Sequence, residues 1–195
     1  MTIAAASRKA VLRTEALRRR GALDASVRDS FSSRLAEQGF AIAQRVGASI
    51  VSVFLPIRDE PDTLPLIAAL SAHGFRTALP VTVSREAALI FRQWCPGDPT
   101  HAGAMKISEP LAGAEPVEPD LLFVPLACFD RRGHRIGFGA GHYDRTLAAL
   151  RARRPVTAVG VTYSAAQAAE IPDEAHDQRL DFVLTERELI DCRGG

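Results

Sequence analysis

The stretch from Arg135 to Arg145 has the residue types and the spacing of an anion-binding loop. Gly137, Gly139 and Gly141 occupy every second position, and glycine allows a backbone to take a positive φ or to approach a ligand closely. A buried strand is predicted before this stretch and a helix after it, so the loop would present free N–H groups and the positive end of a helix dipole. A tight connection without a ligand is the alternative, since glycine spacing alone is weak evidence.

Reactive side chains follow the glycines directly, which favours a binding site because a plain connection does not need them. They are His142, Tyr143, Asp144 and Arg145. An acidic residue beside a phosphate loop usually holds Mg²⁺, with water and phosphate oxygens completing the coordination. Asp144 is placed for that role and Asp177 is a candidate second ligand. Asp144 could equally stabilise the N-terminus of a helix through its charge.

Lys9 and Arg13 could bring positive charge to the same ligand. They lie four positions apart in a predicted helix over 7–20 and therefore share one of its faces. Lys9 and Lys106 are the only lysines of the chain, and this scarcity argues against Lys9 as generic surface charge. A pair of cations that contacts a polyanion and a solvated face of a basic helix both agree with this pattern.

Asp59 and Glu60 follow a predicted strand over 49–55, at its carboxyl end. Ligands gather outside such ends in open α/β sheets, so either carboxylate could hold the polar head of a ligand. A turn followed by a helix cap is the alternative. Further along, Trp94 could pack in the core or stack on a ring, and the irregular segment 95–119 could be a surface arm or a flap over a cleft.

The apolar pattern and the helix and strand breakers predict an alternation of helices and strands. The expected helices cover 7–20, 24–46, 62–70 and the stretch from the glycine loop to 151–154, followed by a short helix capped by Ser164 and Gln167 and a last helical turn capped by Thr185 and Glu188. The expected strands cover 49–55, 75–80, 88–94, 120–125, 156–163 and 181–184. This order predicts a single three-layer α/β/α domain over 1–195, with a Rossmann-like open sheet that is mainly parallel.

The composition is that of an ordinary globular chain, with 47% hydrophobic and 24% charged residues among 195. A net charge of +1 argues against a protein that binds nucleic acid through bulk charge. The three isolated cysteines give no disulfide framework or metal spacing. No run is apolar enough for a signal peptide or a membrane span. We therefore expect a cytoplasmic protein with neither nucleic acid nor a membrane as its partner, and we take it as a monomer.

Familiar nucleotide and nucleophile motifs are missing from the sequence. No G-x-x-x-x-G-K-[ST] is present, and the glycines are spaced G-x-G-x-G rather than G-x-G-x-x-G. No Ser-His-Asp or Cys-His arrangement is recognisable. The residues by themselves therefore indicate a phosphorylated ligand, most simply a nucleotide with Mg²⁺.

The run from Leu122 to Asp130, together with the run from Arg135 to Arg145, resembles the signature of the 5-formyltetrahydrofolate cyclo-ligases, also called 5,10-methenyltetrahydrofolate synthetases. Shorter segments extend the resemblance over essentially the whole chain and arrive in the same order. These segments are 9–13, 54–60, 106–110 and 176–186.

The resemblance implies ATP- and Mg²⁺-dependent ring closure of 5-formyltetrahydrofolate to 5,10-methenyltetrahydrofolate, with release of ADP and phosphate. In the family's mechanism the formyl oxygen attacks the γ-phosphate to give an N5 iminophosphate. The folate N10 then attacks the activated carbon and phosphate departs. Such a pathway asks the protein to position groups, neutralise charge and exclude water.

The resemblance also assigns roles to individual residues. For ATP it implies Lys9, Arg13, Arg135, Gly137, Phe138, Gly139, Ala140, Gly141, His142 and Tyr143. For the folate, with or without a polyglutamate tail, it implies Leu55, Glu60, Phe138, Gly139, Ala140, Gly141 and His142. For Mg²⁺ it implies Asp144 and Asp177. A carboxylate such as Glu60 suits a pterin, whose amino and ring N–H groups are donors.

Two positions depart from the family's pattern. The family often has Lys or Gly where Ala140 stands, and usually Tyr where His142 stands. The change at 140 removes a cation from the loop, and the change at 142 replaces a phenol with a titratable ring. Two alternatives stay open: a catalytically silent relative that binds a folate or nucleotide, and an ATP-dependent enzyme that acts on another N-formyl substrate.

Overall fold

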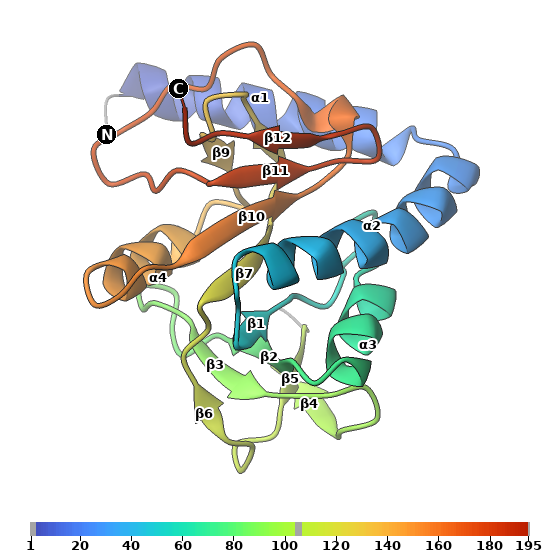
Figure 1. Ribbon diagram of the computed structural model, residues 1–195. Coiled ribbons are helices and arrows are strands. Elements are labelled where there is room, and N and C mark those ends of the chain that lie inside the picture. The colour runs from blue at the N-terminus through green and yellow to red at the C-terminus, as the bar shows by residue number, and fades with distance from the viewer. Residues whose placement is uncertain (1–2, 104–106, 195) are drawn as a thin grey trace.

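The central sheet is open and mainly parallel, as predicted. The computed structural model describes residues 3–103 and 107–194, and within them one sheet has the strand order β12-β11-β10-β7-β1-β2-β3-β6 (Figure 1). The parallel strands are β11 (Phe182–Leu184), β10 (Thr157–Val161), β7 (Leu121–Pro125), β1 (Ile50–Ser52) and β2 (Arg76–Val81). The antiparallel strands are β12 (Leu189–Asp191) at one edge and β3 (Ile90–Gln93) and β6 (Pro116–Val117) at the other.

Helices cover both faces of this sheet and complete the three layers. The helices of the described residues are α1 (Ile3–Gly21), α2 (Ala25–Arg45), α3 (Leu64–Ala72), α4 (His142–Arg151) and the short 3₁₀ helix η2 (Ser164–Ala166). Phe31 of α2 and Leu66 of α3 share one apolar core with Phe123 of β7. Leu147 of α4 shares the second core with Leu122, the neighbour of Phe123. This division follows from the alternation of side chains along a strand.

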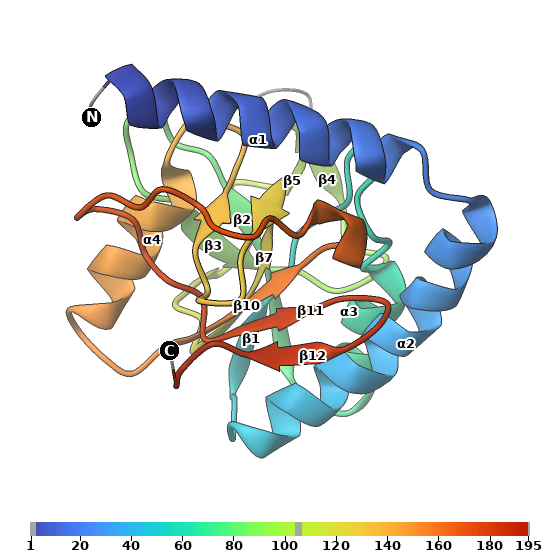
Figure 2. The same ribbon diagram turned by 90° about the horizontal axis from the view of Figure 1, so that it is seen from above.

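The first helix, α1, lies across the carboxyl end of the sheet (Figure 2). It contacts η2, which follows β10, and β8 (Cys128–Phe129), which follows β7. Ala16 is fully buried against this end of the core. The basic residues of α1 are therefore held over the loops that leave the central strands.

The segment 95–119 has more regular structure than the sequence indicated. It contains the antiparallel pair β4 (Thr100–Ala102) and β5 (Ser108–Pro110), as well as β6. Lys106 lies outside the described residues. The indole N–H of Trp94 donates to the Asp98 carbonyl at 3.1 Å and the side chain is buried, so Trp94 packs within the fold.

The helices predicted to begin at the caps Ser164 and Thr185 do not form as expected. Ser164 donates to the carboxylate of Glu186 through both its N–H and its hydroxyl, so it does not form a capping box and only one 3₁₀ turn results. Thr185 does not start a helical turn. Its hydroxyl oxygen accepts the N–H of Glu188 at 3.1 Å, which closes the turn between β11 and β12.

None of the helices in the described part of the chain is both long and apolar enough to cross a membrane.

Candidate active site

The glycine loop connects β9 (Arg135–Ile136) to α4 and has the backbone shape that its sequence predicts. Gly139 and Gly141 take φ values of 103° and 69°, in the region where a side chain is strained. Arg13 of α1 donates from Nε to the carbonyl of Gly137 at 2.7 Å. The predicted cation and the predicted loop therefore meet, although their sequence positions are far apart.

Gly139→Ala is expected to lower the free energy of unfolding by about 1–2 kcal/mol, because alanine at this φ is strained. The added methyl group itself has room, since the nearest atom would be a guanidinium nitrogen of Arg13 at 3.8 Å. Chemical denaturation measures the change. Gly113→Ala is the control, because a Cβ there meets nothing within 4 Å and needs no positive φ, and an equal loss at Gly113 would contradict the argument.

Arg145 fixes the glycine loop to the segment between β2 and β3. Its guanidinium donates to the carbonyls of Ala140 at 2.7 Å, Arg85 at 2.8 Å and Ala87 at 3.2 Å. The ring of His142 lies within hydrogen-bond distance of the same Ala87 carbonyl, 3.1 Å from Nδ1. One side chain thus determines how the loop faces the carboxyl end of the sheet.

Lys9 reaches across to the acidic segment before β11. Its Nζ lies 2.5 Å from Asp177 Oδ2 and 3.0 Å from Glu174 Oε2. Burial acts to lower the pKa of Lys9, but the hydrogen bonds and charges of Asp177 and Glu174 outweigh it and raise that pKa. Lys9 is therefore a fixed positive charge in the N-terminal half of α1, held between two carboxylates.

Asp144 joins the glycine loop to that same acidic segment. Its Oδ1 accepts from a guanidinium nitrogen of Arg135 at 2.8 Å and from the N–H of Gln178 at 3.1 Å. The Arg135 side chain is almost fully buried and also donates to the Gln178 carbonyl. Arg135 would therefore act on an ATP site indirectly, by positioning Asp144 and the backbone at Gln178.

A group of buried polar atoms lies between α1, the loop after β1 and α4. Glu60 Oε2 accepts from the N–H of Ile57 at 3.0 Å. Glu60 Oε1, the Tyr143 hydroxyl and Arg20 Nε are all buried, and none has a hydrogen-bond partner within residues 3–103 and 107–194. Burial raises the pKa of Glu60 to about 7, against the opposing effects of the Ile57 N–H and Arg20. Orphaned buried polar atoms are costly, so such a group is typical of a ligand site.

Comparison with known proteins decides the family. The sequence pattern of the 5-formyltetrahydrofolate cyclo-ligase family matches residues 5–186. The chain belongs to the 5-formyltetrahydrofolate cyclo-ligase family. The 5-formyltetrahydrofolate cyclo-ligase of Mycolicibacterium smegmatis is 33% identical over 189 residues, which cover 93% of this chain and 95% of the relative. The enzyme of the same name from Escherichia coli K12 is 33% identical over 172 residues, 86% and 94% of the two chains.

Solved structures agree with this membership. The 5,10-methenyltetrahydrofolate synthetase of Aquifex aeolicus superposes with a TM-score of 0.79 at 28% identity, covering 96% of this chain and 94% of that one. A synthetase from Mycoplasma pneumoniae has a TM-score of 0.72 at 21% identity and supports the fold. The resemblance noted in the sequence is therefore confirmed.

In this cyclo-ligase family member most of the predicted site residues gather at one end of the sheet. Lys9 and Asp177 are in contact, Arg13 holds Gly137, and Asp144 holds the segment beside Asp177. In the glycine loop, Phe138 and Gly139 are exposed, and Ala140, Gly141 and His142 are half-buried. Leu55 is half-buried against the core of α2 and α3, five residues before Glu60.

Glu174 and Arg20 are the residues that sequence reasoning did not single out. Glu174 shares the Lys9 ammonium with Asp177, and together with His176 these acidic residues place possible ligand atoms within 4.8 Å of one another. The spacing of Glu174 and Asp177, three apart in an acidic connection, was the available signal. Arg20 carries no such sequence signal, because it is the third of three consecutive arginines and nothing local distinguishes it from the other two.

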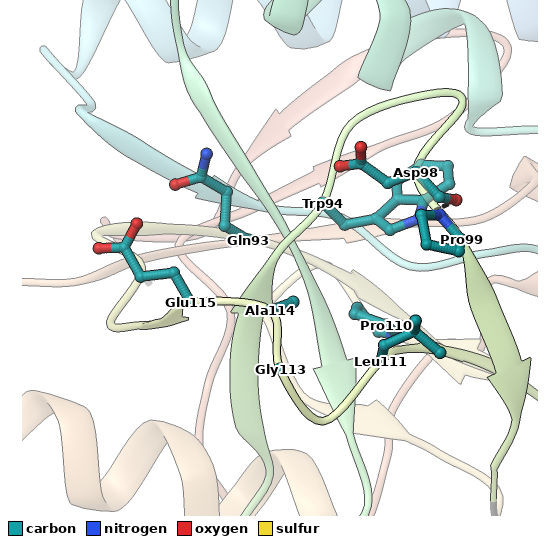
Figure 3. Close-up of a pocket in the computed structure, with 9 residues that line it drawn as sticks. All are labelled: Gln93, Trp94, Asp98, Pro99, Pro110, Leu111, Gly113, Ala114 and Glu115. Carbon is teal, nitrogen blue, oxygen red and sulfur yellow. Dashed lines mark hydrogen bonds between the residues drawn. The ribbon is translucent and has the colours of Figure 1, made fainter.

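A separate pocket of about 400 Å³ lies in the arm around β3, β5 and β6 (Figure 3). Its lining residues are Gln93, Trp94, Asp98, Pro99, Pro110, Leu111, Gly113, Ala114 and Glu115. None of the residues predicted to bind ATP, folate or metal lines it. This pocket is therefore distinct from the candidate active site.

Proposed function

We propose that this protein is an ATP- and Mg²⁺-dependent enzyme that closes 5-formyltetrahydrofolate to 5,10-methenyltetrahydrofolate and releases ADP and phosphate. The observation that carries the proposal is the convergence of the Lys9–Asp177 contact, the glycine loop and Glu60 at the carboxyl end of the sheet, in a member of the cyclo-ligase family. The proposal takes residues 1–195 as one domain that acts as a monomer in the cytoplasm.

The proposed chemistry proceeds through an N5 iminophosphate. The formyl oxygen attacks the γ-phosphorus and the bond to ADP breaks. N10 then attacks the formyl carbon and loses its proton to solvent, the carbon–oxygen bond breaks, and phosphate leaves with the oxygen. Lys9 and Arg13 would neutralise phosphate charge, and the loop from Gly137 to Tyr143 would offer backbone N–H groups.

The carboxylates of this site suit a magnesium ion. Mg²⁺ prefers oxygen ligands and usually binds through one or two carboxylates together with phosphate oxygens. Asp144 Oδ2 has no hydrogen-bond partner in the described residues, and Asp177 Oδ2 already faces a cation, the Lys9 ammonium. Bound there, the metal would draw charge from the phosphates. Asp144 and Asp177 would hold it, and Glu174 would keep Lys9 beside it.

The folate is proposed to bind with its pterin ring beside Glu60. Glu60 Oε1 is buried and has no partner in the described residues, so it can accept from a ring N–H or amino group of the pterin. Phe138 has 42% of its surface exposed at the rim and offers an apolar face to the ring. Leu55 would border the same ring from the loop after β1.

The experiment is a direct assay of the purified protein with ATP, Mg²⁺ and 5-formyltetrahydrofolate, following the absorbance of the methenyl product. We expect product formation that needs all three and releases one phosphate per turnover. Product absent while an authentic cyclo-ligase works under the same conditions would reject the proposal. Turnover of another N-formyl compound, but not of 5-formyltetrahydrofolate, would change the substrate assigned in the proposal.

Arg145→Met is expected to lower kcat/KM about 10- to 100-fold, because three hydrogen bonds from a charged group would no longer hold the loop. Steady-state kinetics with both substrates varied in turn measure the effect. Arg85→Met is the matched control, because only the backbone carbonyl of Arg85 takes part in this contact. Equal activities of the two variants would exclude Arg145 as a positioning residue.

A further inference from the structure

Arg20 is a buried cation whose surroundings do not account for it. Arg20 is 2% exposed, and within the described residues its side chain makes one hydrogen bond, from Nη1 to the carbonyl of Leu126, which is long at 3.5 Å. Nε has no partner in the described residues. Burial lowers the pKa of Arg20, with Glu60 as the largest opposing influence. A guanidinium in such a place needs a further acceptor.

Arg20 and Glu60 are close enough to interact electrostatically but do not touch. Each affects the pKa of the other, yet no ion pair of 4.0 Å or less joins these two described residues. Each also keeps a buried polar atom unpaired, Nε on the cation and Oε1 on the carboxyl group. Within the described residues, the pair therefore has an unpaired donor and an unpaired acceptor within electrostatic range of each other.

The chemistry of the pterin edge matches this arrangement. On a pterin the 2-amino group and N3–H are donors, and the 4-oxo group beside N3 is an acceptor. A carboxyl group that takes the donors leaves the oxo oxygen one ring atom away. A cation that donates a hydrogen bond to the 4-oxo oxygen must lie near the carboxyl group that binds the donors, without contacting it.

We propose that Arg20 is a specificity residue that donates to the 4-oxo group of the substrate's pterin ring, beside the donors held by Glu60. This proposal rests on the proposed function, because it takes 5-formyltetrahydrofolate as the ligand. The Arg20 guanidinium carbon lies 6.0 Å from the centre of the Phe138 ring, so the ring that would border the pterin is next to the same cation. Arg20 would thus give the site a hydrogen-bond donor for the 4-oxo oxygen of the pterin.

Equilibrium binding of two ligands tests the proposal without requiring turnover. The ligands are 5-formyltetrahydrofolate and its counterpart with a 4-amino group in place of the 4-oxo group. The measured quantity is the ratio of their dissociation constants, in the wild-type protein and in Arg20→Met. Glu60 is present in both proteins, so its own preference cancels from the comparison.

We expect Arg20→Met to shift this ratio at least tenfold towards the 4-amino compound, by weakening the 4-oxo ligand, while the dissociation constant for ATP changes little. Arg18→Met is the control, because this neighbouring arginine is exposed and paired with Glu15; it should keep the wild-type ratio. Arg20→Lys keeps the charge, is expected to fold, and should give an intermediate ratio.

An unchanged ratio in Arg20→Met would overturn the inference. If Arg20→Met fails to fold, a wild-type ratio in Arg20→Lys would overturn it in the same way. A wild-type protein that binds both rings but makes no methenyl product would reject the proposed function, and the ratios would still decide on Arg20. A wild-type protein that binds neither ring would reject both.

Discussion

Glu60→Gln should bind 5-formyltetrahydrofolate about 100-fold more weakly than the wild type and yet be more stable above pH 7. The loss of affinity follows from the removal of the charged acceptor that is proposed to bind the pterin donors, since a hydrogen bond to a charged group contributes roughly 1.5–3 kcal/mol. The gain in stability follows from burial. Glu60 is 8% exposed and one of its oxygens has no partner in the described residues.

The sign of the pH dependence follows from the raised pKa of Glu60. Burial raises this pKa from 4.5 to about 7, while the Ile57 N–H and Arg20 oppose the shift, and Tyr143 lies within electrostatic range of the same carboxyl group. Between pH 4.5 and about 7 the folded state keeps a proton that the unfolded state has lost. Stability therefore falls as pH rises through this window, by up to roughly 3 kcal/mol from this group.

Chemical denaturation at pH 5 and pH 8, with folate binding measured in parallel, tests this prediction. Glu60→Gln should show a smaller loss of stability between the two pH values than the wild type. Glu37→Gln, on the exposed face of α2, is the control and should change neither quantity. Wild-type folate affinity in Glu60→Gln would remove this residue from the site.

Lys9→Met should lower kcat/KM for ATP on the order of 100-fold and leave folate affinity nearly unchanged. Lys9 is 2.5 Å from Asp177 and 3.0 Å from Glu174, so its removal leaves two carboxylates without their shared cation. Their negative charge would then repel the phosphates that Lys9 is proposed to attract. We also expect a lower unfolding free energy, since α1 loses its contact with the acidic segment.

ATP and folate saturation curves separate the two effects. Arg8→Met, at the exposed neighbouring position of α1, provides a control with the same loss of one positive charge. A similar ATP dependence in both variants would show that net charge, and not the placement of Lys9, matters. Wild-type kinetics in Lys9→Met would exclude it from the nucleotide site.

Much of the fold could be predicted because local patterns and tertiary structure agree. The central strands are continuous apolar runs, and α3 ends shortly before Gly74, which takes a φ of 83°. The wrong predictions occur where the same local sequence pattern is compatible with two different structures. Thr185 followed three residues later by Glu188 suits a helix cap and also the hairpin turn that is found. The β4–β5 pair lies in a segment rich in turn residues and carries no strong strand pattern.

The sequence proposes the residues of the candidate site, whereas the contacts among them come from the structure. The glycine loop and Asp144 could be recognised because their spacing is local. The contact of Lys9 with Glu174 and Asp177 joins residues that are 165 and 168 positions apart, and no local pattern encodes it. Arg18 and Arg20 are equivalent in sequence, and only the rotation of about 100° per helical residue exposes one and buries the other.

The straightness of α1 has a geometric consequence. Lys9 contacts the acidic segment near one end of this helix, and Arg20 lies buried near the other. With a rise of 1.5 Å per residue the helix sets these two groups about 16 Å apart along its axis. The helix therefore fixes the distance between the proposed phosphate-binding and pterin-binding ends of the site. One residue inserted between them would swing Arg20 by about 100°, so the length of this segment is constrained as strictly as its chemistry.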